Sequence, residues 1–182
     1  AVAAGGTLVY VMRGNRDFLF GQRFATDSGT TLLPDPCVVM LYGQPTLLMH
    51  GDLLCSDDRE YLAFRSLVRD PAWQGEFLGK SLAERAEFAA RARAASGERM
   101  AGLRGDGALE TITDANNETV AATLARFGVT RLIHGHTHRP AVHALLANGR
   151  PARRIVLGDW YEQGSVLRVS ADGFELSVLD HP

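Results

Sequence analysis

The sequence predicts an α/β layered fold in which a sheet-based core carries a helical insertion. Three observations support this prediction: strand-sized apolar runs end in polar loops, a long segment rich in Ala, Arg, Glu and Leu is helical in character, and a series of strands with hairpin signals follows. The predicted core comprises residues 1–57 and 108–182, and the predicted insertion comprises residues 58–107.

The first part of the predicted core consists of strands joined by polar loops. Residues 7–12 (TLVYVM) predict a buried strand that ends at the polar loop 14–17. A short helix begins at about Leu19 and stops at Gly29, since glycine favours the conformation that ends helices. Two strands and the turn between them follow, at residues 38–41, 46–50 and 42–45.

The rest of the chain begins with helices and ends with strands. Pro71 is expected to break the helical region 58–99, and the glycine-rich residues 102–107 predict a loop. The next helix is expected to run from the N-cap Asp114 to Phe127. A short strand is then predicted at residues 132–133. It is followed by a run of antiparallel strands at residues 142–146, 154–157, 165–169 and 174–179, with hairpin turns at Asn148-Gly149 and Asp172-Gly173.

Composition excludes several classes of protein. Of the 182 residues, 46% are hydrophobic and 22% are charged, which argues against a disordered or low-complexity chain. The apolar runs are shorter than the roughly 18 residues of a membrane-spanning helix. The net charge of −2 argues against a general nucleic-acid binder. Cys37 and Cys55 form neither a CxxC motif nor a disulfide framework.

Polar clusters follow three of the predicted strands. They are residues 14–17 (GNRD), 50–52 (HGD) and 134–138 (HGHTH). Ligand sites of layered α/β proteins gather at strand ends, so these loops are expected to converge. Asparagine and histidine form a nitrogen and oxygen donor set that suits Mn, Fe, Zn or Co. An isolated HxH is equally well explained by solvated or core histidines, and only the three loops together favour a metal site.

In this order, GNRD, HGD and GHTH resemble the later motifs of the calcineurin-like metallophosphoesterases. The longer strings at residues 14–19 (GNRDFL), 50–58 (HGDLLCSDD) and 132–143 (LIHGHTHRPAVH) resemble the UDP-2,3-diacylglucosamine hydrolase family, from about Val11 to the last residue. The resemblance implies a metallophosphoesterase β-sandwich flanked by helices with a helical cap. It also implies that UDP-2,3-diacylglucosamine is cleaved at its pyrophosphate to UMP and 2,3-diacylglucosamine 1-phosphate (lipid X), in lipid A biosynthesis. Two Mn²⁺ ions per complete site and a peripheral position on the cytoplasmic side of the bacterial inner membrane are implied as well.

The resemblance also implies roles for individual residues. Asn15, His50 and His136 match ligands of the second metal, and His138 matches a ligand of the first. Arg16 matches a residue that contacts substrate phosphate, for which the planar guanidinium is well suited. The implied catalytic residues are Asn15, Arg16 and His136. Without the resemblance, Arg16 could be a loop arginine that pairs with Asp17.

Three other polar residues near these motifs have no ligand role in the family pattern. His134 is expected to be structural, or to support a ligand from behind. Asp52 is expected to orient His50 and not to bind metal. A change at His143 is expected to affect mainly stability.

The resemblance also implies a set of substrate contacts. Four of them lie in the insertion, at Asp58, Tyr61, Arg93 and Ser96, and three lie in the core, at Asn15, Arg16 and His136. Considered alone, the four insertion residues are ordinary surface or packing residues at helical spacing. Between Ser96 and Asp114 the sequence departs from the family pattern, and Arg99 or Arg104 could supply the contacts expected there.

The insertion has more apolar bulk than a solvated helix needs. This bulk has two interpretations: packing between helices, or a groove for two acyl chains that also meets a membrane surface. Residues 80–104 carry six basic and three acidic residues, which favours anionic headgroups. The apolar residues in question are Phe64, Trp73, Phe77, Leu78, Leu82 and Phe88.

The superfamily pattern places an early Asp-x-His and a Gly-Asp motif before the GNRD loop. Residues 1–13 contain no Asp, Glu or His. We therefore expect this chain to lack the carboxylate that bridges the two metals and the first strands of the fold, and to expose an unpaired sheet edge. By itself it is expected to bind metal weakly and to hydrolyse little substrate.

Two other functions are compatible with the same residues. One is a metallophosphoesterase for a soluble nucleotide or phosphoprotein, which would have no need for an apolar insertion. The other is a truncated inactive homologue that binds metal or a partner without turnover, which the metal content per chain would reveal.

Overall fold

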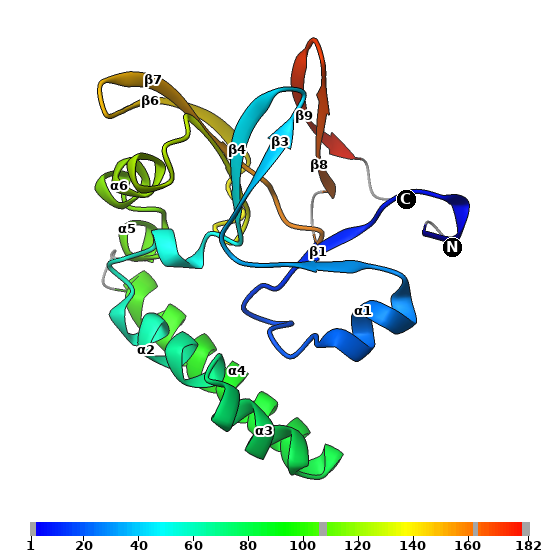
Figure 1. The fold of residues 1–182 in the computed structure, drawn as a ribbon. Coiled ribbons are helices and arrows are strands. Elements are labelled where there is room, and N and C mark those ends of the chain that lie inside the picture. Colours follow the sequence, from blue (N-terminus) through cyan, green and yellow to red (C-terminus); the bar gives the residue numbers. More distant parts are fainter. Residues whose placement is uncertain (1–2, 106–108, 162–163, 180–182) are drawn as a thin grey trace. The chain divides into compact units, whose positions relative to one another are not determined.

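A computed structural model describes residues 3–105, 109–161 and 164–179 (Figure 1). The chain forms two compact units, one of Ala1–Leu54 with Ala115–Pro182 and the other of Cys55–Asp114. The first unit contains a mixed sheet flanked by helices, which confirms the predicted α/β layered fold.

A five-stranded sheet in the order β3-β4-β5-β7-β6 forms the centre of the first unit. Strands β4, β5 and β7 are parallel, whereas β3 and β6 run antiparallel to their neighbours. The antiparallel pairing predicted after the helical region is confirmed for β6 and β7, while the other edge of β7 pairs in parallel with β5. The strands are β3 (Cys37–Leu41), β4 (Gln44–Met49), β5 (Arg131–His134), β6 (Ala141–Ala147) and β7 (Arg150–Val156).

The remaining strands of this unit form two small sheets. β1 and β2 are parallel, and β8 and β9 form an antiparallel hairpin. Of the predicted strand 7–12 only the last three residues are strand, and β2 was not predicted. The elements are β1 (Tyr10–Met12), β2 (Thr31–Leu33), β8 (Gly164–Ser170), β9 (Gly173–Leu179), α1 (Gln22–Ser28), α6 (Asn117–Phe127), and the 3-10 turns η1 (Ala3–Gly5) and η2 (Asp52–Leu54).

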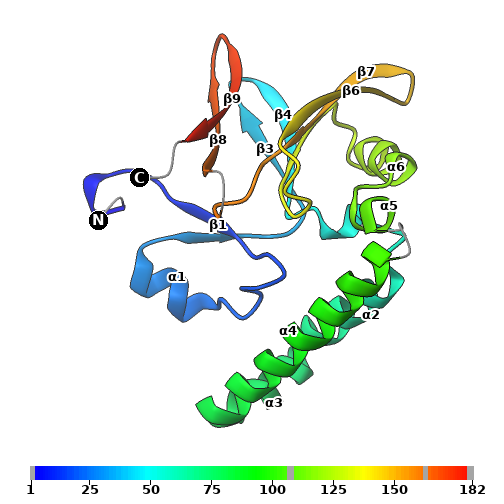
Figure 2. The ribbon, with the colours of Figure 1, turned by 180° about the vertical axis from the view of Figure 1, so that it is seen from behind.

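The two faces of the central sheet are covered differently (Figure 2). Leu47 of β4 and Leu132 of β5 are fully buried in a core cluster that includes Leu124 of α6. Burial of one such leucine contributes about 1.5–3 kcal/mol. Side chains alternate along a strand, so Arg131 points to the other face. There its guanidinium and that of Arg153 lie 5.8 and 5.5 Å from the ring centre of Phe174 in β9.

Glycine and asparagine determine the boundaries of α6. The Asn116 side chain accepts the N–H groups of Glu118 and Thr119, so Asn116 is the N-cap and the predicted cap Asp114 is wrong. Gly128 ends the helix with φ +66°, as predicted. Since either residue type can cap a helix, the sequence alone does not choose between positions 114 and 116.

The second unit is helical. Pro71 begins α3 with Asp70 as N-cap, which confirms the predicted break. Residues 102–105, predicted as a loop, continue α4, and residues 106–107 of that prediction lie outside the described residues. No helix of the described residues is long and apolar enough to cross a membrane. The helices are α2 (Arg59–Val68), α3 (Pro71–Gly79), α4 (Leu82–Gly105) and α5 (Leu109–Thr113).

Aromatic stacking holds α3 and α4 together. Trp73 and Phe77 stack at 4.7 Å between ring centres, and both contact Phe88 of α4, at 5.5 and 5.1 Å. Such pairs add about 0.5–1.5 kcal/mol each beyond the burial of their area. Three of the apolar residues singled out in the sequence thus pack on one another, whereas Leu78 and Leu82 are exposed.

Candidate functional site

Parallel strand pairing brings two of the histidine loops together. Met49 of β4 pairs with His134 of β5, so the chain leaves both strands at the same edge of the sheet. Immediately beyond the strands, the Gly135 N–H donates to the His50 carbonyl at 2.9 Å. The predicted convergence of HGD and GHTH therefore follows from strand register.

The side chains of His50 and His136 meet at this edge. His50 Nε2 lies 3.1 Å from His136 Nδ1, and the rings are nearly perpendicular with centres 4.8 Å apart. His136 has φ +67°, a left-handed conformation that is uncommon for a residue other than glycine. Such a backbone is uncommon outside functional sites and turns, and here it accompanies the contact of the ring with His50.

The GNRD loop approaches the same histidine. The Asn15 N–H donates to His50 Nε2 at 3.3 Å, and a Cβ on Gly14 would come within 2.9 Å of His50 Cε1. Glycine is needed at position 14 because a side chain there would occupy the space of the imidazole. The loop is closed by the Gly14 N–H, which donates to Asp17 Oδ1. All three predicted ligands of the second metal are thus neighbours.

The backbone around His50 is held by two further residues. Gly51 has φ +117°, and a Cβ there would lie 2.7 Å from His134 Nδ1 and 2.8 Å from the Gly135 carbonyl. The His50 N–H donates to Asp35 Oδ1 at 2.9 Å. Asp35 was not predicted, because it lies 15 residues from His50 in a turn that carries no motif.

His138 lies in a different environment. Its side chain is half exposed, its φ is +55°, and its Nδ1 is 3.8 Å from Asp159 Oδ2. Asp159 was also not predicted, although a signal existed: it follows the buried strand residues Ile155 and Val156, as the other polar loops follow theirs. Arg16 is exposed at the GNRD loop.

The geometry of the histidine pair fits one shared cation. Nitrogen ligands at about 2.1 Å from a tetrahedral or octahedral cation lie about 3.0–3.4 Å apart, and the observed separation is 3.1 Å. Because His50 Nε2 accepts the Asn15 N–H, this nitrogen is the unprotonated one, and a metal ion bound to it would take the place of that hydrogen bond. Among the described residues no three His, Cys, Asp or Glu side chains gather as a metal site. The third predicted ligand, Asn15, is an amide.

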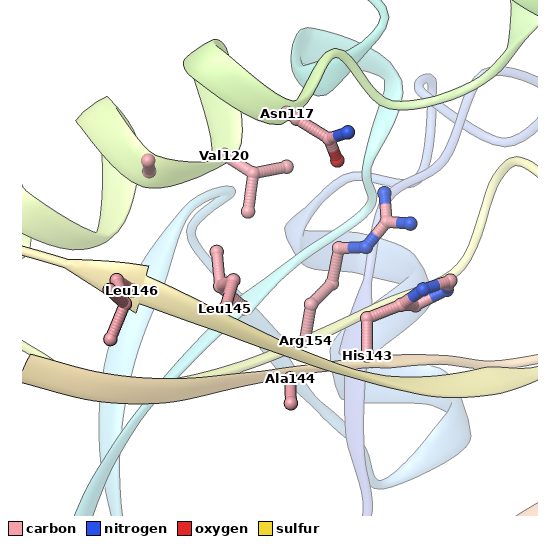
Figure 3. A pocket seen from close by; sticks show the side chains of 8 residues that line it. Asn117, Val120, His143, Ala144, Leu145, Leu146 and Arg154 are labelled. Atoms are coloured by element: carbon pink, nitrogen blue, oxygen red, sulfur yellow. The ribbon is translucent and has the colours of Figure 1, made fainter.

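Two polar residues near the His50–His136 pair are buried. His134 is buried, and its Nδ1 lies 2.8 Å from the Gly135 carbonyl. Asp52 is fully buried at the start of η2. His143 is exposed on β6 and lines a cavity of about 380 Å³, together with the exposed Asn117 and the buried Arg154 (Figure 3). None of the predicted site residues lines that cavity.

Within the second unit, Asp58 has defined partners. It is the N-cap of α2, where its Oδ1 accepts the Tyr61 N–H at 3.0 Å. Its two oxygens also accept the Arg99 guanidinium at 2.7 and 3.1 Å, and Arg99 Nε donates to Glu60 at 2.8 Å. Burial by itself lowers the pKa of Arg99, but the two carboxylates outweigh it and raise the pKa. Tyr61 is half-buried.

The other two predicted substrate contacts of this unit lie on α4. Arg93 and Ser96 are exposed and three positions apart, so they share a face of the helix. None of the 24 described residues of α4 is buried. Arg104, the other candidate for the segment after Ser96, is exposed in the last turn.

Together, the mixed sheet flanked by helices and the histidine loops at its edge define a metallophosphoesterase-like α/β fold. The chain is 59% identical to UDP-2,3-diacylglucosamine hydrolase of Xanthomonas campestris pv. campestris, over 98% of this chain and 73% of the relative. It is 58% identical to the protein of that name from Xanthomonas axonopodis pv. citri over the same shares, and 57% identical to that from Stenotrophomonas maltophilia, over 96% and 71%. No family model matches. The chain belongs to the UDP-2,3-diacylglucosamine hydrolase family, a family of hydrolases.

Proposed function

We propose that the protein hydrolyses the pyrophosphate of UDP-2,3-diacylglucosamine to UMP and 2,3-diacylglucosamine 1-phosphate in lipid A biosynthesis. The observation that carries the proposal is the meeting of His50 and His136 beside the Asn15 loop, in a chain 59% identical to relatives of that name. The donor set, the 3.1 Å nitrogen separation and the family all favour a metal-assisted hydrolysis.

Asn15, His50 and His136 would hold one divalent cation, and His138 would contribute to a second. The resemblance favours Mn²⁺ for both. Such cations, when bound, lower the pKa of water and offset the charge that develops at phosphorus. The protein's own contribution is to hold the nitrogen donors in place: Gly14 and Gly51 allow the close approach, and Asp35 fixes the His50 backbone.

Arg16 would bind a phosphate oxygen of the pyrophosphate. Its guanidinium is exposed on the same loop as Asn15, and its planar fork can donate two parallel hydrogen bonds. Water attacks the α-phosphorus and the bond from that phosphorus to the bridging oxygen breaks. UMP thus gains the oxygen of water, while the bridging oxygen leaves with the sugar phosphate.

The second unit would bind the diacylglucosamine portion. Arg93 and Ser96 offer polar contacts on α4, and Tyr61 offers one on α2. Asp58 would contact the substrate from its position in the ion pair with Arg99. The exposed Leu78 and Leu82 and the excess of basic residues in 80–104 support contact with acyl chains and an anionic membrane surface. We propose a peripheral position on the cytoplasmic side of the inner membrane.

The test is hydrolysis in ¹⁸O-labelled water by the protein expressed from its complete reading frame, with Mn²⁺ and UDP-2,3-diacylglucosamine in detergent micelles. We expect ¹⁸O in UMP and none in the sugar phosphate, and little turnover after chelation of the metal. Label in the sugar phosphate would contradict attack at the α-phosphorus. Faster hydrolysis of a soluble nucleotide diphosphate lacking acyl chains would contradict the substrate.

A further inference from the structure

Asp159 is held next to the GHTH loop by backbone pairing. Beyond the end of β7, the Leu157 N–H donates to the His134 carbonyl at 2.8 Å, which continues the β5–β7 pairing to the edge of the sheet. Asp159 follows two residues later, with a side chain only 15% exposed. Asp159 therefore lies beside His138 two residues beyond the last backbone contact between β7 and β5.

The two oxygens of Asp159 have different partners. Oδ1 accepts the Tyr161 N–H at 3.0 Å, which orients the carboxylate. Oδ2 then faces His138 Nδ1 at 3.8 Å. This separation is longer than a hydrogen bond, so the interaction between Asp159 and His138 is electrostatic.

A carboxylate at this position affects which nitrogen of the imidazole carries the proton. A neutral histidine has one N–H and one lone pair. An N–H at Nδ1 is attracted to Asp159 Oδ2, whereas a lone pair at Nδ1 is repelled by it. The carboxylate therefore favours the Nδ1–H tautomer, which leaves the lone pair on Nε2.

We propose that Asp159 is a positioning residue that holds His138 as the Nδ1–H tautomer, so that Nε2 is presented to a metal ion. The proposal rests on the proposed function insofar as it makes His138 a metal ligand. The side chain of His138 is half exposed, and Nε2 is the ring nitrogen that does not face Asp159. Carboxylates behind metal-binding histidines act in this way in general.

The first experiment measures the tautomer without metal. The ¹⁵N chemical shifts of His138 are recorded in the metal-free protein at about pH 9, where histidine side chains are neutral. We expect Nδ1–H in the parent. In Asp159→Asn the amide oxygen can still accept the Tyr161 N–H, while the amide N–H₂ turns toward Nδ1. That variant should carry the proton on Nε2, whereas the exposed Asp172→Asn serves as the matched control and should not change the spectrum.

The second experiment measures Mn²⁺ affinity by titration calorimetry, in the protein expressed from its complete reading frame. Asp159→Asn should weaken binding about 10- to 100-fold. The same tautomer in parent and Asp159→Asn, or a changed tautomer with unchanged Mn²⁺ affinity, overturns the proposal. A different outcome separates the two proposals: Mn²⁺ affinity unchanged in His138→Ala while the parent carries Nδ1–H. This result would contradict the role of His138 as a metal ligand in the proposed function, but not its interaction with Asp159.

Discussion

The two units hold their predicted functional residues by different means. In the first unit these residues are positioned mainly by the backbone. Parallel strands bring His50 and His136 to one edge of the sheet, and Gly14 and Gly51 approach imidazole rings at distances that a Cβ atom would not allow. In the second unit the positioning comes from side chains: Asp58 caps the N-terminus of α2 and forms an ion pair with Arg99 of α4.

This difference predicts different responses to mutation. Where a backbone contact positions a ligand, one added methyl group changes the geometry of the site. On a helix such as α4, which has no buried residue along its described length, the same change is absorbed by solvent. Substitutions of equal size should therefore have large effects at the sheet edge and small effects in the helices.

The largest effect is expected from His136→Ala. Loss of one of the two nitrogen donors 3.1 Å apart should lower kcat/KM at least about 100-fold, on the scale of removing one preorganised group from an active site. Mn²⁺ content by mass spectrometry of the native protein should fall in parallel. His143→Ala, an exposed histidine on β6, is the control and should retain metal and activity. Equal losses in both variants would show that the ligand assignment is wrong.

Gly51→Ala tests whether the backbone carries the site. The added Cβ meets the Gly135 carbonyl and the His134 ring at a φ of +117°, so the loop must move. We expect a loss of about 2–4 kcal/mol in the free energy of unfolding, from backbone strain and steric overlap together. Urea denaturation gives this quantity. A stability equal to that of the parent would indicate that the His50 loop is free to adjust.

Arg16→Lys separates charge from shape in the same unit. Lysine keeps the positive charge but loses the two-pronged fork, so we expect about 1–3 kcal/mol less transition-state stabilisation. The measurement is kcat/KM with UDP-2,3-diacylglucosamine, beside metal content, which should be unchanged. Parent-like kcat/KM would remove Arg16 from the substrate site.

Arg99→Met tests the side-chain pairing of the second unit. The substitution removes two hydrogen bonds to the buried Asp58 and one to the exposed Glu60. We expect it to lower the free energy of unfolding by about 1–2 kcal/mol. The raised pKa of Arg99 means that the charged form is favoured in the folded state, so this contribution is lost only as the pH rises through the folded-state pKa. The difference between parent and variant in thermal unfolding should therefore be the same at pH 6 and pH 8, because both values lie far below the pKa of an arginine.

Local residue chemistry explains which elements the sequence predicted. Gly29 and Gly128 end helices with φ of +68° and +66°, and Asn148 and Gly149 form their predicted turn with φ of +50° and +70°. These positions require a conformation that few residues adopt, so they are visible without any tertiary contact. Gly102 and Gly105 misled the prediction because helix α4 tolerates them.

The residues that sequence analysis missed act across the chain. Asp35 binds the backbone of His50 and Asp159 faces His138, yet neither belongs to a local pattern with its partner. Family resemblance pointed to Asn15, His50 and His136. Strand register explains why the two histidines meet, and the Asn15 N–H contacts His50 Nε2 from a separate loop. The ligand set proposed for the second metal was thus suggested by motifs, whereas the contacts of Asp35 and Asp159 became visible only in the fold.

The smallest effect, and one of opposite sign, is expected from Gly97→Ala. Gly97 lies in the middle of α4, and a Cβ there would meet no atom within 4 Å. Since alanine loses less backbone entropy than glycine on forming a helix, the variant should be more stable by about 0.5–1 kcal/mol. Gly128→Ala is the matched control: its φ of +66° is unfavourable for alanine, so the same added methyl group should destabilise the first unit. Hydrogen exchange along α4 and α6 measures the two effects separately. A stabilised Gly128→Ala or a destabilised Gly97→Ala would show that the two units do not differ in the way their backbones are constrained.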